Sequence, residues 1–191
     1  VVSSSGCTVT FTNAGRSGMF AVGDPVRISS KNGPFFAQAT CTGLTNFGDG
    51  LTQVTLDQAL SVPAGTWGSN PKYNGAGYKI INCHLGNVRS RAIIPKADNG
   101  LISGCTISNA AIGIQIGPEA SWTESDYCWN VTVTNNTLVN CGSSAISVVN
   151  DGAIGNSNIV VTGNFIGDVS QGSGVEITGC NDAAVTGNLL F

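Results

Sequence analysis

Three carboxylates stand at matching places in the second half of this 191-residue chain. Asp98, Glu119 and Asp151 each follow, by three residues, an apolar position near the end of a short β-rich segment. If these segments stack as neighbouring strands, successive carboxylates lie roughly 5 Å apart and alternate ones about 10 Å apart. These values bracket the separations between paired carboxyls in retaining and inverting glycosidases. The apolar positions are Pro95, Ile116, Val148 and Ile177, and Cys180 takes the fourth place of the column.

The carboxylate column predicts general acid–base chemistry at a glycosidic bond. Like charges held this close push their pKa values apart, so one carboxyl can stay protonated while another is ionised. Glu119 or Asp151 would then protonate the leaving oxygen, and the other, or Asp98, would activate water. An accidental alignment explains the column equally well, because Asp and Glu favour turns.

The stretch from residue 117 to residue 129 interleaves acids with aromatic side chains. We expect Trp122 to stack on a sugar ring, with Glu124 and Asp126 accepting hydrogen bonds from sugar hydroxyls. The alternative is a loop folded back on the flank of the protein, with a tryptophan as its anchor.

Basic residues gather on the amino-terminal side of the carboxylate column. Arg91 and Lys96 are predicted to hold a substrate oxygen or to orient the carboxylates, although simple charge balance with Asp98 and Glu119 explains them as well. His84 is the sole histidine, and the chain has no Cys-x-x-Cys motif. We therefore predict neither a metal site nor a cofactor.

A repeat positions these residues. Four segments share the pattern apolar, two residues, Asn or Cys, one residue, apolar, and a fifth shares most of it. Repeats of this length, built from short β-rich pieces between Gly and Asn, indicate stacked strands in a parallel β-helix. The recurring Asn is expected to form a ladder at an inner turn. The central residues of the five segments are Cys83, Cys105, Asn136, Asn164 and Asn188.

The fold class predicted for the whole chain is all-β. Residues 1–19 would form an early strand of a right-handed parallel β-helix, and residues 20–66 a small antiparallel, barrel-like insertion with Gly-rich turns. Residues 67–77 are predicted to form a linker, and residues 78–191 the main β-helix. The chain ends without the polar cap that usually closes such a stack, so we expect a second chain or a further segment to continue it.

Seven cysteines are many for a reducing compartment. Cys83 and Cys105 would stand on adjacent strands about 4.8 Å apart, within the range that a disulfide tolerates, but a stack of two buried thiols fits as well. Asn130 and Asn135 begin sequons for N-glycosylation. Together these features favour a secreted, extracellular protein.

Charge separates the two parts of the chain. All eight Lys and Arg residues lie at or before Lys96, whereas the residues after it carry acids only. Such an acidic region repels phosphate backbones, which argues against nucleic-acid binding. No apolar stretch approaches the roughly 18 residues that a membrane helix needs.

The segments 87–102, 114–119 and 130–136, together with Trp122 and Glu124, resemble right-handed parallel β-helix carbohydrate-active proteins. The nearest group is the α-1,3-galactosidases of glycoside hydrolase family 110. This resemblance implies a small β-barrel inserted early in the helix and metal-independent, inverting removal of a terminal sugar by paired carboxylates. The site positions that it covers are Asp98, Glu119 and Glu124.

The sequence is compatible with two alternative functions. The first is a secreted glycoside hydrolase that acts on terminal, galactoside-like sugars of a glycan substrate. The alternative is a non-catalytic β-helix, either a glycan-binding module or a filament-forming surface protein whose open end stacks on a neighbour. A polysaccharide lyase is disfavoured, because it needs a basic residue at the site and acts on acidic substrates.

Overall fold

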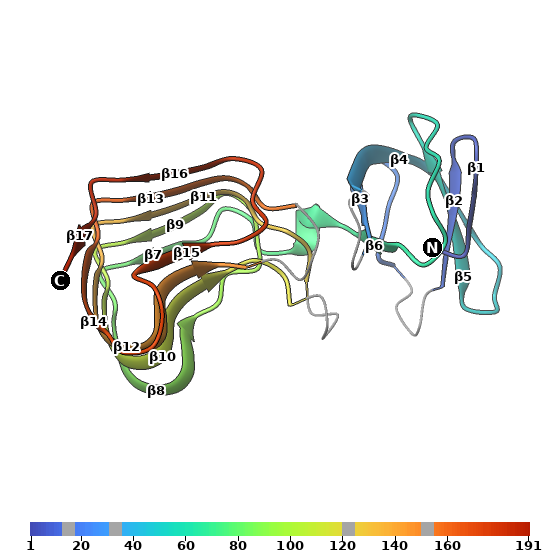
Figure 1. Cartoon of the computed structure of the whole chain (residues 1–191). Coiled ribbons are helices and arrows are strands. Elements are labelled where there is room, and N and C mark those ends of the chain that lie inside the picture. Colours follow the sequence, from blue (N-terminus) through green and yellow to red (C-terminus); the bar gives the residue numbers. More distant parts are fainter. Residues whose placement is uncertain (13–17, 31–35, 120–124, 150–154) are drawn as a thin grey trace. The chain divides into compact units, whose positions relative to one another are not determined.

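The computed structural model describes residues 1–12, 18–30, 36–119, 125–149 and 155–191 (Figure 1). The described chain is all-β apart from one turn of 3₁₀ helix, η1 (Pro71–Tyr73). It divides into two compact units, Val1–Asn74 and Gly75–Phe191. No helix among the described residues is long and apolar enough to cross a membrane.

The first unit is a six-stranded antiparallel sheet with the order β1-β2-β5-β4-β3-β6. Its core contains Val9, Phe11 and Val54, because alternate residues of paired strands face the same side. The strands are β1 (Ser3–Ser5), β2 (Thr8–Thr12), β3 (Pro25–Ser29), β4 (Phe36–Asn46), β5 (Leu51–Leu56) and β6 (Trp67–Ser69).

This antiparallel unit is larger than the sequence predicts. Residues 1–19 do not begin the parallel part, because β2 pairs antiparallel with β5 and buries Val9 and Phe11 in the core of this unit. The predicted linker 67–77 also differs, because β6 pairs with β3 and residues 71–73 form η1. The insertion predicted for residues 20–66 is thus the middle of a sheet that begins at β1 and ends at β6.

The second unit consists of two parallel sheets between which the chain alternates. One has the order β16-β13-β11-β9-β7, and the other β17-β14-β12-β10-β8, with β15 paired to β12 (Figure 1). Each return to a sheet places the new strand beside the previous one. The strands are β7 (Lys79–Ile81), β8 (His84–Ile93), β9 (Gly100–Ser103), β10 (Thr106–Ile116), β11 (Trp129–Thr134), β12 (Thr137–Val148), β13 (Ser157–Thr162), β14 (Phe165–Val169), β15 (Val175–Ile177), β16 (Ala183–Thr186) and β17 (Leu189–Leu190).

The register of these sheets follows the predicted repeat. The first apolar position of each segment pairs with its equivalent in the next, and so does the second. The resulting columns form the core, which explains why the spacing of the apolar pairs is constant while the lengths between repeats vary. The columns are Ile80, Ile102, Val133, Val161 and Val185, and Leu85, Ile107, Leu138, Ile166 and Leu190.

The predicted asparagine ladder is present between the two sheets. The side-chain oxygen of Asn164 accepts from the backbone amide of Asn136 at 3.0 Å and from its Nδ2 at 2.9 Å. Asn188 accepts from Asn164 in the same way, at 2.9 and 2.8 Å. Each Nδ2 also donates to a carbonyl of the preceding repeat, as Asn136 does to Ile102 at 3.0 Å. The ladder thus satisfies buried backbone groups where the chain turns.

Cysteine replaces asparagine at the start of this ladder. The Sγ of Cys105 donates to the Ile80 carbonyl at 3.5 Å, the bond that Nδ2 makes in later repeats. Cys83 is exposed, Cys105 is buried, and all seven cysteines are free. The predicted disulfide between Cys83 and Cys105 is therefore not formed. The alternative of two stacked, buried thiols holds for Cys105 but not for Cys83, which is exposed.

Candidate functional site

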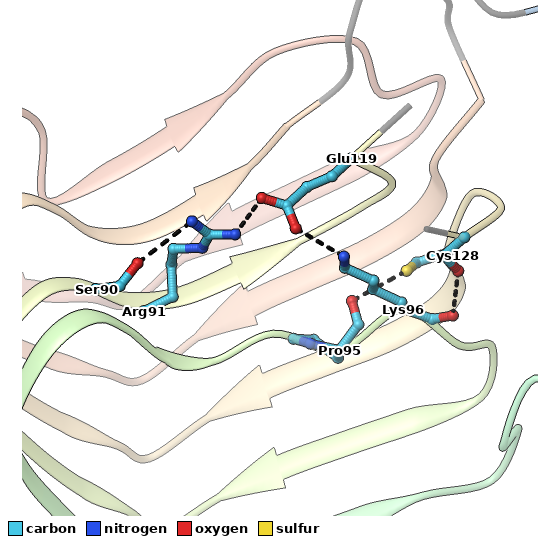
Figure 2. Close-up of polar contacts among 7 residues, drawn as sticks. Ser90, Arg91, Pro95, Lys96, Glu119 and Cys128 are labelled. Atoms are coloured by element: carbon cyan, nitrogen blue, oxygen red, sulfur yellow. Dashed lines mark hydrogen bonds and ion pairs between the residues drawn. The ribbon is translucent and has the colours of Figure 1, made fainter. Parts of the chain in front are cut away.

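Glu119 lies at the centre of a charged cluster beyond the end of β10. Its carboxylate forms ion pairs with the guanidinium of Arg91, a residue of β8, and with the ammonium of Lys96 at 2.7 Å (Figure 2). The side chains are 15% exposed for Glu119, 18% for Lys96 and 28% for Arg91, so the cluster is partly shielded from water. Ser125 Oγ donates to the Lys96 carbonyl at 2.9 Å and ties the returning chain to the same place.

The two cations determine the charge of Glu119. The hydrogen bond from Lys96 holds the pKa of the Glu119 carboxyl below its ordinary value, burial opposes this, and Arg91 lowers the pKa further. Glu119 is therefore ionised at neutral pH. An ionised carboxylate can activate water or stabilise positive charge, but it cannot donate a proton to a leaving group. Of the two roles predicted for Glu119, the structure favours the base.

Asp98 is buried and has a different set of partners. Its Oδ1 accepts from the backbone amide of Trp129 at 2.8 Å, at the start of β11 in the next repeat. The column of Ile116, Val148 and Ile177 is in register as predicted. Asp98 nevertheless uses its carboxylate to join repeats, whereas Glu119 is bound by Arg91 and Lys96. Asp98 thus joins neighbouring repeats, and its pairing with Glu119 stays a prediction.

The predicted sugar-binding loop is described only at its end. Asp126 is buried, and its Oδ1 accepts from the amide of Tyr127 at 2.8 Å. Trp129 Nε1 donates to the Gly155 carbonyl at 2.8 Å. The Trp129 contact is of the kind that an anchoring tryptophan makes, and both interpretations of the loop stay predictions. Asp151, Trp122 and Glu124 lie outside the described residues.

Behind the cluster is a buried thiol. Cys128 Sγ donates to the Pro95 carbonyl at 3.4 Å, and burial raises the pKa of this thiol to about 12 (Figure 2). A thiol that stays protonated is neither a nucleophile nor a metal ligand. Among the described residues no cluster of His, Cys, Asp or Glu could hold a metal ion.

A second carboxylate, that of Glu176, lies on the sheet that contains β10. Sequence reasoning did not select it as a site residue. Glu176 in β15 accepts hydrogen bonds from Ser144 Oγ at 3.0 Å and Ser147 Oγ at 3.4 Å. Gln115, Ser147 and Glu176 are aligned across β10, β12 and β15. Successive residues of a strand point to opposite faces, so these three lie opposite the core residue Ile146 and its equivalents. The signal was present in the sequence, where a polar residue stands between two apolar positions of the last three second strands.

The two glutamates are related by the register. Arg91, which holds Glu119, is aligned through Ile112 of β10 with Ser144, which holds Glu176. These anchors are two strand spacings apart, or about 10 Å. Gln115, Ser144 and Ser147 are buried although they carry polar side chains. We call this set the polar strip: Arg91, Lys96, Gln115, Glu119, Ser144, Ser147 and Glu176.

The two sequon asparagines stand at corners of the repeat. Asn130 is exposed, yet its Nδ2 donates to Asn99 at 3.0 Å and its Oδ1 accepts from Asn158 at 2.9 Å. A glycan on this nitrogen would break the hydrogen bond from Asn130 to Asn99. Asn135 is also exposed, and its backbone is left-handed with a φ of 54°. Glycosylation at either asparagine stays a prediction.

Comparison with known proteins gives no family for this chain. No family model matches it, and none of the curated proteins searched does.

Proposed function

We propose that residues 78–191 form a right-handed parallel β-helix. The support is the alternation of successive strands between two parallel sheets, with one new strand added at each return. The continuous ladder from Cys105 through Asn136 and Asn164 to Asn188 supports the same architecture, because it requires repeats stacked in register.

On this fold we propose a glycoside hydrolase that acts at the polar strip. The observation that carries the proposal is the pair of carboxylates in the polar strip, Glu119 held by Arg91 and Lys96, and Glu176 held by Ser144 and Ser147. Inverting glycosidases hold their two carboxyl groups about 6.5–9.5 Å apart to admit a water molecule, and the proposal requires the same of Glu119 and Glu176. Members of glycoside hydrolase family 110 remain the enzymes that we propose it resembles.

The proposal gives the two glutamates different roles. Glu119 is kept ionised by Lys96 and Arg91, so it would remove a proton from the attacking water. Glu176, which Ser144 and Ser147 position, is then the carboxyl assigned to protonate the leaving oxygen. The water oxygen bonds to the anomeric carbon as the glycosidic bond breaks, and the configuration inverts. Gln115 supplies a donor and an acceptor for sugar hydroxyls between the two.

The test compares Glu119→Gln and Glu176→Gln with Asp168→Asn on a panel of aryl glycosides, α-galactosides first. Asp168 is an acid of the same unit outside the polar strip, so its variant controls for loss of one negative charge. We expect each Gln variant to lose about 10²–10⁴-fold in kcat/KM while Asp168→Asn keeps its activity. Retained activity in Glu176→Gln would exclude the assigned acid. Absence of turnover by a chain that circular dichroism shows to be folded would exclude hydrolysis.

Glycan binding without catalysis is the second candidate. It is favoured by the two ion pairs of Glu119, which fix this carboxylate before any ligand arrives. Glycan-array binding by a chain that lacks turnover, weakened by Gln115→Ala, would identify this function.

A further inference from the structure

Two Asn-Gly steps in the described chain have very different surroundings. One is Asn74–Gly75, directly after η1, and the other is Asn99–Gly100, at the start of β9. A third, Asn32–Gly33, lies outside the described residues. In such a step the glycine nitrogen can attack the side-chain carbonyl carbon of the asparagine, because glycine has no Cβ to hinder the approach. The fold decides whether the two groups can meet.

The Asn99–Gly100 step is held in one conformation. The backbone amide of Asn99 donates to the Trp129 carbonyl at 2.8 Å, and its Oδ1 accepts from Asn130 Nδ2 at 3.0 Å. Gly100 is buried in β9, which pairs with β11, and the Tyr78 ring packs where a Cβ of Gly100 would lie. The backbone cannot turn here without breaking these contacts, so we expect this step to be stable.

The Asn74–Gly75 step lacks these restraints. In the described chain neither Oδ1 nor Nδ2 of Asn74 has a hydrogen-bond partner, although both atoms are buried. The Gly75 amide likewise has no acceptor among the described residues. Gly75 is exposed, with a φ of 85° and open space where a Cβ would lie, and Gly77 has a φ of 83°. Because glycine rotates over a wide range of backbone angles, the Gly75 nitrogen can reach the Asn74 side chain.

Ring closure at this step also removes polar groups that have no partner. The Gly75 nitrogen bonds to Cγ of Asn74, the bond from Cγ to Nδ2 breaks, and ammonia leaves with the proton of the Gly75 amide. The product is a succinimide, which is uncharged and has no N–H group. The two unpaired N–H donors of the buried Nδ2 are lost in this step. A buried donor without an acceptor destabilises the folded chain, so the surroundings of Asn74 favour the ring.

We propose that Asn74 is a deamidation site, at which the succinimide formed with Gly75 is opened by water to aspartate or isoaspartate. Water adds its hydroxyl to one imide carbonyl carbon, and the ring nitrogen leaves that carbon and takes the proton. Opening at the side-chain carbonyl gives aspartate, and opening at the backbone carbonyl gives isoaspartate, which lengthens the backbone by one methylene. Either product adds a negative charge directly after η1.

This modification goes beyond the proposed hydrolysis and is independent of it. Asn74 belongs to neither hydrophobic core, so we expect both cores to persist in the deamidated chain.

The test incubates the full chain at mildly alkaline pH and follows both steps by peptide mapping with mass spectrometry. The succinimide lacks the mass of one ammonia, and enzymatic methylation detects isoaspartate. In the folded chain we expect Asn74 to react at least about tenfold faster than Asn99. In urea both are unrestrained Asn-Gly steps, so their rates should become equal. Asn74→Gln should stop the reaction at this position, because the longer side chain would have to close a larger ring.

Asn130→Gly is the matched test of the restraint on Asn99. It removes the hydrogen bond to Asn99 Oδ1, and Gly also adopts the left-handed φ of 57° at this position. We expect the reaction at Asn99 to become faster and that at Asn74 to stay unchanged, in a chain that circular dichroism shows to be folded. Equal rates at Asn74 and Asn99 in the folded native chain, or a faster Asn99, would overturn the proposal. An unmodified Asn74 in a folded chain whose unfolded form reacts at both steps would overturn it too.

Discussion

At the scale of single residues, Glu119 illustrates how its neighbours set the chemistry of a carboxyl. Lys96 makes the largest contribution to its lowered pKa, and Arg91 adds to it. We therefore predict that Lys96→Met raises the pKa of Glu119 more than Arg91→Met does. Side-chain carboxyl titration by NMR measures both shifts. Equal shifts, or a larger one in Arg91→Met, would contradict this ranking.

The same lowered pKa makes stability depend on pH. A carboxyl whose pKa is lower in the folded state contributes stability that is complete above its unfolded pKa, about 4.3 for glutamate. The contribution is lost as the pH falls through the folded pKa of Glu119. We expect the difference in unfolding free energy between the native chain and Glu119→Gln to be constant at neutral pH and to shrink below about pH 4. Urea unfolding at a series of pH values measures this difference.

Asn164 is the residue at which the inner ladder is best tested. Its amide donates to the Val133 carbonyl and to Asn188, and its oxygen accepts from Asn136. Asn164→Ala leaves several buried backbone groups unpaired, so we predict a loss of about 3 kcal/mol or more in unfolding free energy. Asn164→Cys should lose less, because Cys105 makes the equivalent carbonyl contact naturally. The exposed Asn140→Gly is the control, since Gly also adopts its left-handed φ of 54°.

At the scale of elements, the bend within β8, β10 and β12 has its own column of left-handed residues. Asn87, Asn109 and Asn140 have φ between 53° and 57°, and Asp168 in β14 has a φ of 53°. Asn is the side chain that best tolerates this conformation apart from Gly. The amides form an outer row, with Asn109 Nδ2 donating to Asn87 at 3.1 Å and Asn140 Nδ2 donating to Asn109.

Asp168 is aligned with Asn140, because Cys141 pairs with Val169. A carboxylate cannot donate to the Asn140 oxygen, whereas an amide could extend the outer row. We predict that Asp168→Asn stabilises the chain by about 0.5–1 kcal/mol. Denaturant unfolding measures the change, and Asp168→Ala provides the contrast because Ala cannot extend the row and introduces strain at positive φ. A destabilised Asp168→Asn would show that the row ends at Asn140.

Sequence predicts some of these elements and not others. The apolar pairs are repeated in every segment and the central Asn in the last three, so the register was predictable, and so was the ladder. The role of Thr8–Thr12 was not, because alternation identifies a strand without identifying its partner, which here is β5. For the site, sequence identified Glu119 and its cations. The sequence spacing also placed Asp98 in one column with Glu119. Spacing alone does not reveal that the Asp98 carboxylate accepts a hydrogen bond from the Trp129 amide.

At the scale of the whole molecule, the two units have separate cores. The core of Val1–Asn74 includes Val9, Val26 and Val54, and that of Gly75–Phe191 includes Ile102, Leu138 and Ile159. The first unit is held by antiparallel pairing of its strands, and the second by parallel stacking of repeats. Because the contacts that build one core do not build the other, each unit can unfold separately.

A matched pair of substitutions tests this independence. Leu56 in the first unit is 2% exposed and Leu138 in the second is 0% exposed, so Leu→Ala creates a cavity of similar chemistry in each. We predict a cost of about 2–5 kcal/mol in each case, confined to the unit that carries the change. Calorimetry should show two transitions, and hydrogen exchange followed by mass spectrometry should assign each to its unit. Loss of protection in both units from either substitution alone would mean that the chain unfolds as one body. With separate transitions, Leu56→Ala should leave the polar strip intact, so its effect on turnover would report directly on whether the first unit takes part in function.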